Sequence, residues 1–266
     1  MAYKLGGIPS VKASATEMAD FLEVQCLRSD ESTFSAQEAA QALGILSEDE
    51  IEEDFEDRTA HDIPFLSELQ YVEDRRVQAN SRYPFITDGF SISIAQDCNE
   101  LDRDIYIFLL LATRNDMGRN RMVGNLDGAM LFEKLCAEIL RNYFGANCNS
   151  FVFGTGDDEH AKFENKLNNL LLNLGEPKTT MRRPDDDGGH QKDDKLDVVA
   201  HIPFRDKRVG QFIAFCQCKT GDSWDALLGQ LTPWKFSKNY FNPPLSFTPI
   251  CCYMVSVALA NDWSRK

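Results

Sequence analysis

Two apolar segments joined by a short charged turn constrain the fold of this chain more than any other feature. Residues 196–200 (LDVVA) and 215–219 (FCQCK) have the composition of buried strands, and the turn RDKR lies between them. Side chains two residues apart on a strand share a face, so Gln217 and Lys219 are predicted to point the same way. With Asp197 they would place a carboxylate, an amide oxygen and an ammonium at one sheet edge. Such a set can hold a hard divalent cation beside a positioned water.

The rest of the second half alternates between helix and strand patterns. Asp127 is expected to cap a helix at residues 128–144, whose apolar residues repeat at i, i+3, i+4 and i+7 and which Gly145 ends. The other expected elements are a strand at 151–153, a helix at 161–174, the two strands above, a helix from about 223 to 240 and an apolar strand at 247–258. This order predicts an α/β fold with a mixed central sheet flanked by helices.

The negative charge of the chain is concentrated in its first half. Residues 1–120 hold 10 Lys and Arg against 24 Asp and Glu, whereas residues 121–266 hold 18 of each, so the first half accounts for the whole net charge of −14. We therefore expect an acidic, mainly helical N-terminal module at 1–120, with a regulatory or partner-docking role, and a separate α/β domain at 121–266. The charge of the chain does not exclude a nucleic-acid partner for that second domain.

Three elements are expected within the N-terminal module. They are a helix at 35–43 that Ser35 caps, a strand at 85–95 and an amphipathic helix at 101–113. The carboxylate-rich segment at 47–57 is interpreted as a solvated helix with a thin apolar stripe. A docking surface for a basic partner and a nucleic-acid mimic are its alternatives.

Composition and cysteine spacing bound the cellular context. The longest apolar run, at residues 105–112, is far too short to span a bilayer, and the N-terminus lacks the layout of a signal peptide. A cytoplasmic protein is therefore expected. The eight cysteines form no C-x-x-C pair and no zinc-finger spacing, so we expect buried, reduced thiols.

The order of these motifs resembles the PD-(D/E)XK nuclease superfamily, which has the restriction-endonuclease-like fold. In that family a helix that carries a glutamate precedes a strand that opens with aspartate, and the next strand carries (E/Q)-x-K. Residues 131–135 (LFEKL) match the helix motif, and Asp197 opens the strand. Residues 217–219 (QCK) give the glutamine form, as in Mrr-like and several anti-phage nucleases. The resemblance covers about residues 125–260.

The resemblance implies a role for each matched residue. Asp197 is the expected primary ligand of Mg²⁺, for which Mn²⁺ would substitute, and Gln217 adds a neutral amide oxygen. Lys219 is expected to hold or deprotonate the attacking water and to stabilise charge in the transition state. Glu133 would complete the metal shell directly or through water, and Gln230, on the helix expected after the lysine, matches a polar position found in Mrr-like members. Glutamine in place of glutamate removes one charge and predicts weak metal binding.

Neighbouring residues compete for these roles or support them. Glu138 is an alternative to Glu133 on the same helix, and further acids before the first strand are alternative metal ligands: Asp185, Asp186, Asp187, Asp193 and Asp194. The basic residues that flank the site are candidate phosphate contacts: Arg182, Arg183, Lys192 and Lys195. His201 is expected to have a structural or rim role. Trp224 and Trp234 are expected to lie in the core.

The resemblance implies a metal-dependent DNA endonuclease, the nuclease component of a bacterial restriction or anti-phage defence system. Because the chain has no Walker A sequence, an ATP-driven step would need a partner such as an ATPase, helicase or sensor subunit. Cleavage of both strands of a duplex also favours a homo-oligomer. Two alternatives stay open: a non-catalytic scaffold subunit with the nuclease fold, and a nuclease that acts on RNA or branched DNA. No membrane partner is expected.

Overall fold

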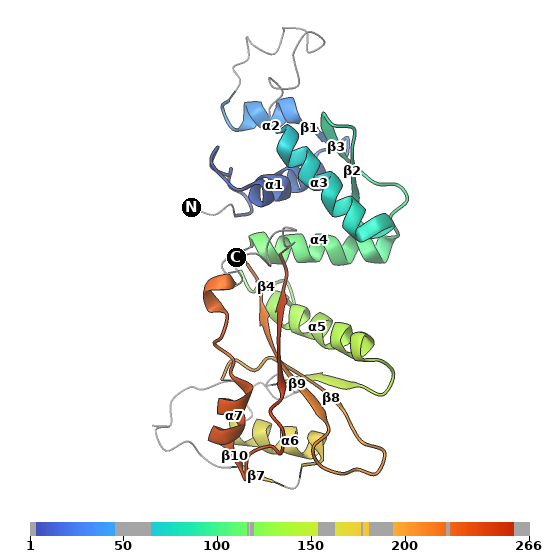
Figure 1. Cartoon of the computed structure of the whole chain (residues 1–266). Helices are drawn as coiled ribbons and strands as arrows, with labels where there is room; N and C mark the ends of the chain where they lie inside the picture. Colours follow the sequence, from blue (N-terminus) through green and yellow to red (C-terminus); the bar gives the residue numbers. More distant parts are fainter. Residues whose placement is uncertain are drawn as a thin grey trace. The chain divides into compact units, whose positions relative to one another are not determined.

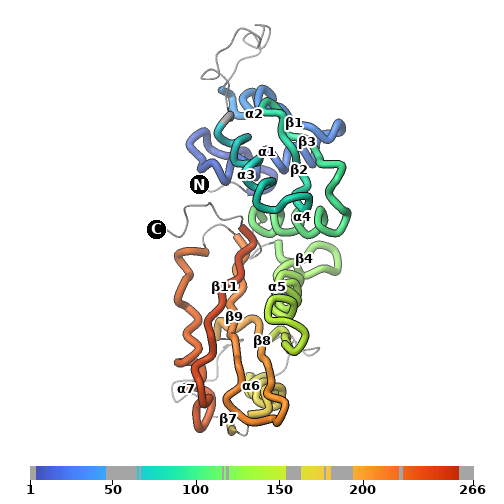
Figure 2. The backbone as a smooth tube through the Cα atoms, turned by 45° about the vertical axis from the view of Figure 1, so that its right-hand side comes forward, coloured from blue at the N-terminus to red at the C-terminus, as the bar shows by residue number. Residues whose placement is uncertain are grey.

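The chain divides into two compact units in a computed structural model (Figures 1 and 2). The described residues are 4–45, 65–115, 117, 120–153, 163–176, 178–180, 194–221 and 224–257. Of these, unit 1 contains those up to residue 115 together with residues 256–257, and unit 2 contains those from 117 to 255. The C-terminal residues of unit 1 are held there by a hydrogen bond of 2.9 Å from the Thr113 hydroxyl to the Ser256 hydroxyl.

Unit 1 combines helices with a small antiparallel sheet. Its described elements are α1 (Ala15–Arg28), β1 (Thr33–Ser35), α2 (Ala36–Ala42), α3 (Leu66–Ala79), η3 (Asn80–Arg82), β2 (Phe85–Thr87), β3 (Ser91–Ile94) and α4 (Glu100–Arg114). β3 is the central strand and is antiparallel to both β1 and β2.

Local sequence signals account for several of these boundaries. The Ser35 hydroxyl accepts a hydrogen bond from the Glu38 N–H at 3.1 Å and so caps α2, which confirms the helix expected at 35–43. The amphipathic helix expected at 101–113 is confirmed as α4. The single strand expected at 85–95 is instead the hairpin β2–β3, because Asp88 accepts hydrogen bonds from two following N–H groups and Gly89 adopts a φ of +92°. The carboxylate-rich segment at 47–57 lies outside the described residues.

A buried charge network joins α1, α3 and α4. The Arg75 guanidinium lies 2.7 Å from the Asp20 carboxylate and 2.5 Å from the Glu23 carboxylate, and Arg114 Nε lies 2.6 Å from Asp20. The Tyr83 hydroxyl donates to Glu23 at 2.6 Å. Burial raises the pKa of the Glu23 carboxyl, while the Arg75 guanidinium acts in the opposite direction. These polar contacts therefore fix three helices of unit 1 to one another.

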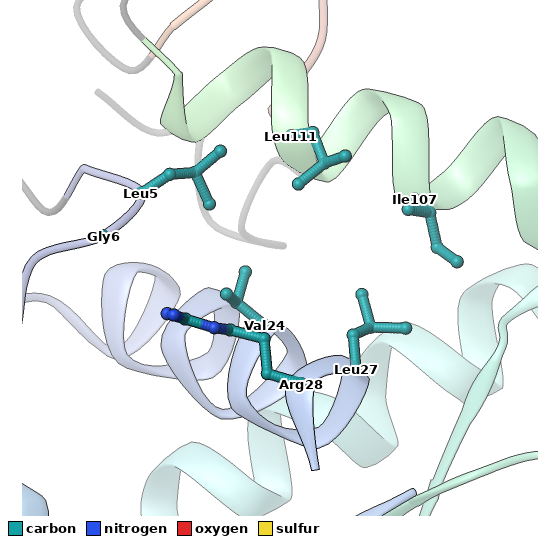
Figure 3. Close-up of a pocket in the computed structure, with 7 residues that line it drawn as sticks. All are labelled: Leu5, Gly6, Val24, Leu27, Arg28, Ile107 and Leu111. Atoms are coloured by element: carbon teal, nitrogen blue, oxygen red, sulfur yellow. The ribbon is translucent and has the colours of Figure 1, made fainter. Parts of the chain in front are cut away.

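Unit 1 also contains an apolar cavity of about 370 Å³, shown in Figure 3. Its lining residues come from the N-terminal segment, α1 and α4: Leu5, Gly6, Val24, Leu27, Arg28, Ile107 and Leu111. None of these described lining residues is a carboxylate. The cavity therefore lacks the oxygen ligands that a hard cation needs.

Unit 2 is built around a mixed four-stranded sheet in the order β11-β9-β8-β6. Its described elements are β4 (Met122–Val123), β5 (Leu126–Asp127), α5 (Gly128–Phe144), β6 (Asn149–Val152), α6 (Phe163–Leu174), β7 (Thr179–Thr180), β8 (Val198–Ile202), β9 (Phe212–Lys219), η4 (Asp225–Leu227), α7 (Pro233–Tyr240), β10 (Phe241–Asn242) and β11 (Ile250–Val255). β6, β8 and β9 are successively antiparallel, and β11 is parallel to β9. The expected α/β class with a mixed sheet is confirmed.

The two faces of this sheet pack against different helices. Phe215 of β9 lies in a core with Phe236 of α7 and Leu170 of α6, and the ring centroids of Phe215 and Phe236 are 5.4 Å apart. Cys218, three residues further along β9, points to the other face and contacts Cys136 of α5. Hence α6 and α7 cover one face, and α5 covers the other.

The predicted elements of unit 2 hold best where the local signals are strong. The helix at 128–144 is confirmed as α5, and its N-cap Asp127 accepts from the Met130 N–H at 3.0 Å. The helix expected from about 223 to 240 is wrong in its first half, because Gly229 adopts a φ of +83° and α7 begins only at Pro233. The strand expected at 247–258 is shorter, as β11.

Three side-chain expectations have different outcomes. Trp224 is buried, as expected, whereas Trp234 is 48% exposed and does not lie in the core. His201 is buried against Gln211, with 2.7 Å between Nδ1 and Oε1, in agreement with a structural role. All eight cysteines are free thiols, but Cys251 is exposed rather than buried.

Across the described ranges, no helix has both the length and the apolar character needed to cross a bilayer.

Candidate metal centre

The main sheet brings Asp197 and Gln217 together at one end of strands β8 and β9. Val198 pairs with Cys216 at the last step of the antiparallel ladder, and Asp197 directly precedes β8 at that end. The Asp197 N–H donates to the Cys216 carbonyl at 3.0 Å, and the Asp197 carboxylate accepts from the Cys218 N–H at 2.7 Å. These two bonds hold the carboxylate beside β9, next to the glutamine.

The Gln217 side chain is fully buried and only half satisfied. Its Nε2 donates to Gln230 Oε1 at 3.4 Å, whereas its Oε1 has no hydrogen-bond partner among the described residues. A buried polar atom in this state costs about 1–3 kcal/mol and is rare in folded proteins. A cation or a water bound between this oxygen and the Asp197 carboxylate would remove that cost. The donor set therefore fits a hard divalent metal ion.

Gln230 lies next to Gln217, but in a turn and not on a helix as expected. The Gly229 N–H donates to the Tyr253 hydroxyl at 2.6 Å, which fixes this turn to β11. Tyr253 is the parallel register partner of Gln217 and so lies beside the glutamine on the neighbouring strand. Tyr253 was not predicted at the site because this register pairs residues that are 36 positions apart. No local pattern carries that information.

Replacement of Tyr253 by phenylalanine is expected to loosen the turn that carries Gln230. The variant removes the acceptor of the Gly229 N–H, worth about 1 kcal/mol or roughly fivefold in local opening. Amide hydrogen exchange of residues 229–230 should therefore accelerate by about that factor. The control is Tyr143→Phe, at a tyrosine of α5 that is 81% exposed. Equal exchange rates in the two variants would contradict the assigned role.

Lys219 is the last residue of β9 and is half-buried. It lies two residues beyond Gln217, so the alternation of the strand places both on the same sheet face. At this position an ammonium can reach a water or an anion bound at the strand end. Asp197, Gln217 and Lys219 thus lie at the same end of the sheet, where β8 begins and β9 ends.

Glu133 comes to the same end of the sheet on the opposite face. The ring of Phe144 lies 4.8 Å from that of Phe212, and Cys136 contacts Cys218, so α5 runs antiparallel to β9. Glu133, three residues before Cys136, lies about 4.5 Å further toward the C-terminal end of β9. The described residues contain no group of three or more His, Cys, Asp or Glu side chains arranged to hold a metal. Glu133 therefore does not complete a carboxylate cluster with Asp197.

Comparison with known proteins assigns no relative. No protein-family model, no curated protein and no solved structure matches the chain.

The Cys218 thiol lies on the sheet face that α5 covers. Contacts with Cys136 and then Cys216, together with burial, raise the pKa of the Cys218 thiol. A thiol held protonated is a poor nucleophile and a poor ligand for a hard cation. Cys218 packs with Cys136 and Cys216 on this face, away from the Gln217 side chain.

The remaining candidates are separated by the structure. Glu138 is exposed and pairs with Arg141 at 2.9 Å, so it belongs to the surface of α5. Lys195 is exposed two residues before Asp197, where it remains a candidate phosphate contact, and Asp194 is half-buried. The other candidates lie outside the described residues: Arg182, Arg183, Asp185, Asp186, Asp187, Lys192 and Asp193.

Proposed function

We propose that unit 2 is a metal-dependent nuclease domain that hydrolyses phosphodiester bonds in DNA. The buried Oε1 of Gln217 carries this proposal, because it lacks a partner among the described residues and the next residue, Cys218, holds the Asp197 carboxylate through its N–H. Mg²⁺ prefers carboxylate and neutral oxygen ligands and keeps several waters. Asp197 and Gln217 would hold this ion, and waters would complete its shell; Glu133, on the opposite face of the sheet, is not assigned to it.

Lys219 supplies the second part of the proposed chemistry. A bound Mg²⁺ lowers the pKa of its water and offsets phosphate charge. The Lys219 ammonium, on the same sheet face, would orient that water and stabilise the negative charge that develops on the phosphoryl oxygens. Asp197, held by the Cys218 N–H, stays fixed through this step.

The fold and the charge distribution are compatible with this proposal. A mixed sheet flanked by helices, with α5 on one face and α6 and α7 on the other, supports the proposal of a PD-(D/E)XK-like domain. We extend the proposal to a cytoplasmic role in a bacterial restriction or anti-phage system. There a motor or sensor partner, a second copy of the chain, or both would assist cleavage of a duplex.

The test is metal-dependent cleavage joined to direct metal binding. The full chain is incubated with supercoiled plasmid, linear duplex, single-stranded DNA, RNA and a branched junction in Mg²⁺, Mn²⁺ or EDTA. Cleavage is expected with either metal and not with EDTA. Mn²⁺ binding, followed by electron paramagnetic resonance, is expected to be lost in Asp197→Asn and kept in the control Asp225→Asn, at an exposed carboxylate of η4.

The outcomes separate the alternatives. Binding of Mn²⁺ that does not depend on Asp197 would overturn the proposed metal site. If the chain neither cleaves any substrate nor binds Mn²⁺, the non-catalytic scaffold replaces the nuclease. Cleavage restricted to RNA or to junctions would keep the site and change the substrate.

A further inference from the structure

We infer that the outer face of α7 binds an unpaired nucleic-acid strand that continues from the proposed metal site. This α7 surface consists of Trp234, Lys235 and Lys238. All three side chains are exposed, and the tryptophan is 48% exposed. The inference rests on the proposed nuclease function and names the form of the substrate.

Packing of the inner side of α7 settles which residues face outward. Phe236 and Tyr240 lie in the core of unit 2, and Phe236 contacts Phe215 of β9. In a helix of 3.6 residues per turn, Trp234, Lys235 and Lys238 then share the side away from the sheet. An exposed indole at this place is not needed for the core.

The charge of this segment differs from that of the whole chain. Residues 226–257 contain two lysines, Lys235 and Lys238, and no acidic residue, whereas the chain has a net charge of −14. Neither lysine forms an ion pair within the part of the chain that the structure describes. The α7 surface is therefore complementary to phosphate, although the protein as a whole repels it.

The α7 surface lies a short distance along the chain from the site. Gln230, which accepts from Gln217, precedes Trp234 by four residues, so their Cα atoms are separated by at most about 14 Å. A nucleic-acid strand rises about 3.4 Å per nucleotide when stacked. A strand with its scissile phosphate at Asp197 would reach the indole within a few nucleotides.

The chemistry of the three residues favours an unpaired strand. Lysines contact phosphates of any sequence and of either strand form. A half-exposed indole stacks on the face of a base, and a base inside a duplex has both faces covered. Trp234 therefore selects a single-stranded segment, and the lysines add affinity that depends on salt.

Fluorescence anisotropy with labelled oligonucleotides tests the inference. The assay uses the full chain with Lys219→Ala in Mg²⁺, a single strand and the matching duplex. Trp234→Ala is expected to weaken single-strand binding about tenfold and duplex binding less than twofold. For the single strand, a plot of log association constant against log salt concentration has a negative slope. The double change Lys235→Gln with Lys238→Gln should make this slope less steep by about 1.4.

Matched controls lie elsewhere on unit 2. Phe204→Ala changes an aromatic side chain that is 50% exposed after β8, and Lys134→Gln changes an exposed lysine of α5 on the other sheet face. Both are expected to bind like the parent, and circular dichroism confirms that each variant is folded. Equal effects of Trp234→Ala and Phe204→Ala, equal losses on duplex and single strand, or no binding by the parent would overturn the inference.

The two proposals fail in different ways. If the chain cleaves in a metal-dependent way but the α7 variants bind like the parent, the inference about the α7 surface is wrong and the nuclease proposal stands. If single-strand binding needs Trp234 but the chain neither cleaves nor binds Mn²⁺, the inference about the α7 surface stands and the nuclease proposal is wrong.

Discussion

Replacement of Lys219 by alanine is expected to slow phosphodiester cleavage by about 10²–10⁴-fold. The ammonium is two residues beyond the buried glutamine on the same sheet face. It would act on the water and on the charge that develops in the transition state, and it is not a metal ligand. Mn²⁺ binding should therefore be unchanged in this variant, in contrast to Asp197→Asn.

Single-turnover cleavage with saturating enzyme measures this effect without interference from product release. The control is Lys134→Ala, at an exposed lysine of α5 on the opposite sheet face, which should cleave at the parent rate. A loss of less than tenfold in Lys219→Ala would contradict the role of the lysine. So would a parallel loss of Mn²⁺ binding, because it would mean that the site had been disrupted and not only deprived of one group.

Local signals explain which parts of the fold and site were predictable. The bounds of α5 follow from a capping carboxylate, a regular apolar spacing and a terminal glycine, all within residues 127–145. The position of Asp197 beside residues 216–218 was predictable for a similar reason. Their strands are consecutive in sequence and antiparallel, so one turn sets the register.

Non-local packing explains the features of the fold and site that could not be predicted from the sequence. The β9–β11 register, which brings Tyr253 beside the glutamine, depends on a parallel connection through α7. The unsatisfied amide oxygen is a property of the folded core and leaves no trace in sequence spacing. Trp234 was expected in the core because most tryptophans are buried, but its helix already fills the core with Phe236 and Tyr240.

In unit 1, replacement of Arg75 by alanine is expected to destabilise the fold by about 3–5 kcal/mol. The Glu23 side chain is fully buried and that of Asp20 nearly so, and both contact the Arg75 guanidinium. Loss of the guanidinium leaves a buried negative charge that Arg114, which contacts Asp20, only partly offsets. Hydrogen exchange of the buried amides of α1, read by mass spectrometry, measures this change without assuming that both units unfold together.

The matched control is the neighbouring residue of α3. Arg76 is 41% exposed and lies 3.9 Å from Glu73, so Arg76→Ala should change stability by about 0.5 kcal/mol or less. Equal exchange rates in the Arg75 and Arg76 variants would show that the buried network does not stabilise unit 1.

The pH dependence of stability provides an independent test of the same buried network. Burial raises the pKa of Glu23 above its ordinary value of 4.5, and removal of Arg75 takes away the charge that opposes this rise. A carboxyl whose pKa is higher in the folded state stabilises the fold most below its unfolded pKa, and this stability is lost as pH rises through the folded pKa. The loss of stability in Arg75→Ala, measured against Arg76→Ala, should therefore become smaller as the pH falls toward 4.5. The double variant Arg75→Ala with Glu23→Gln carries no buried charge at position 23. Its loss of stability should therefore be smaller and should not change over this pH range. A loss that still depends on pH would assign the titration to another group.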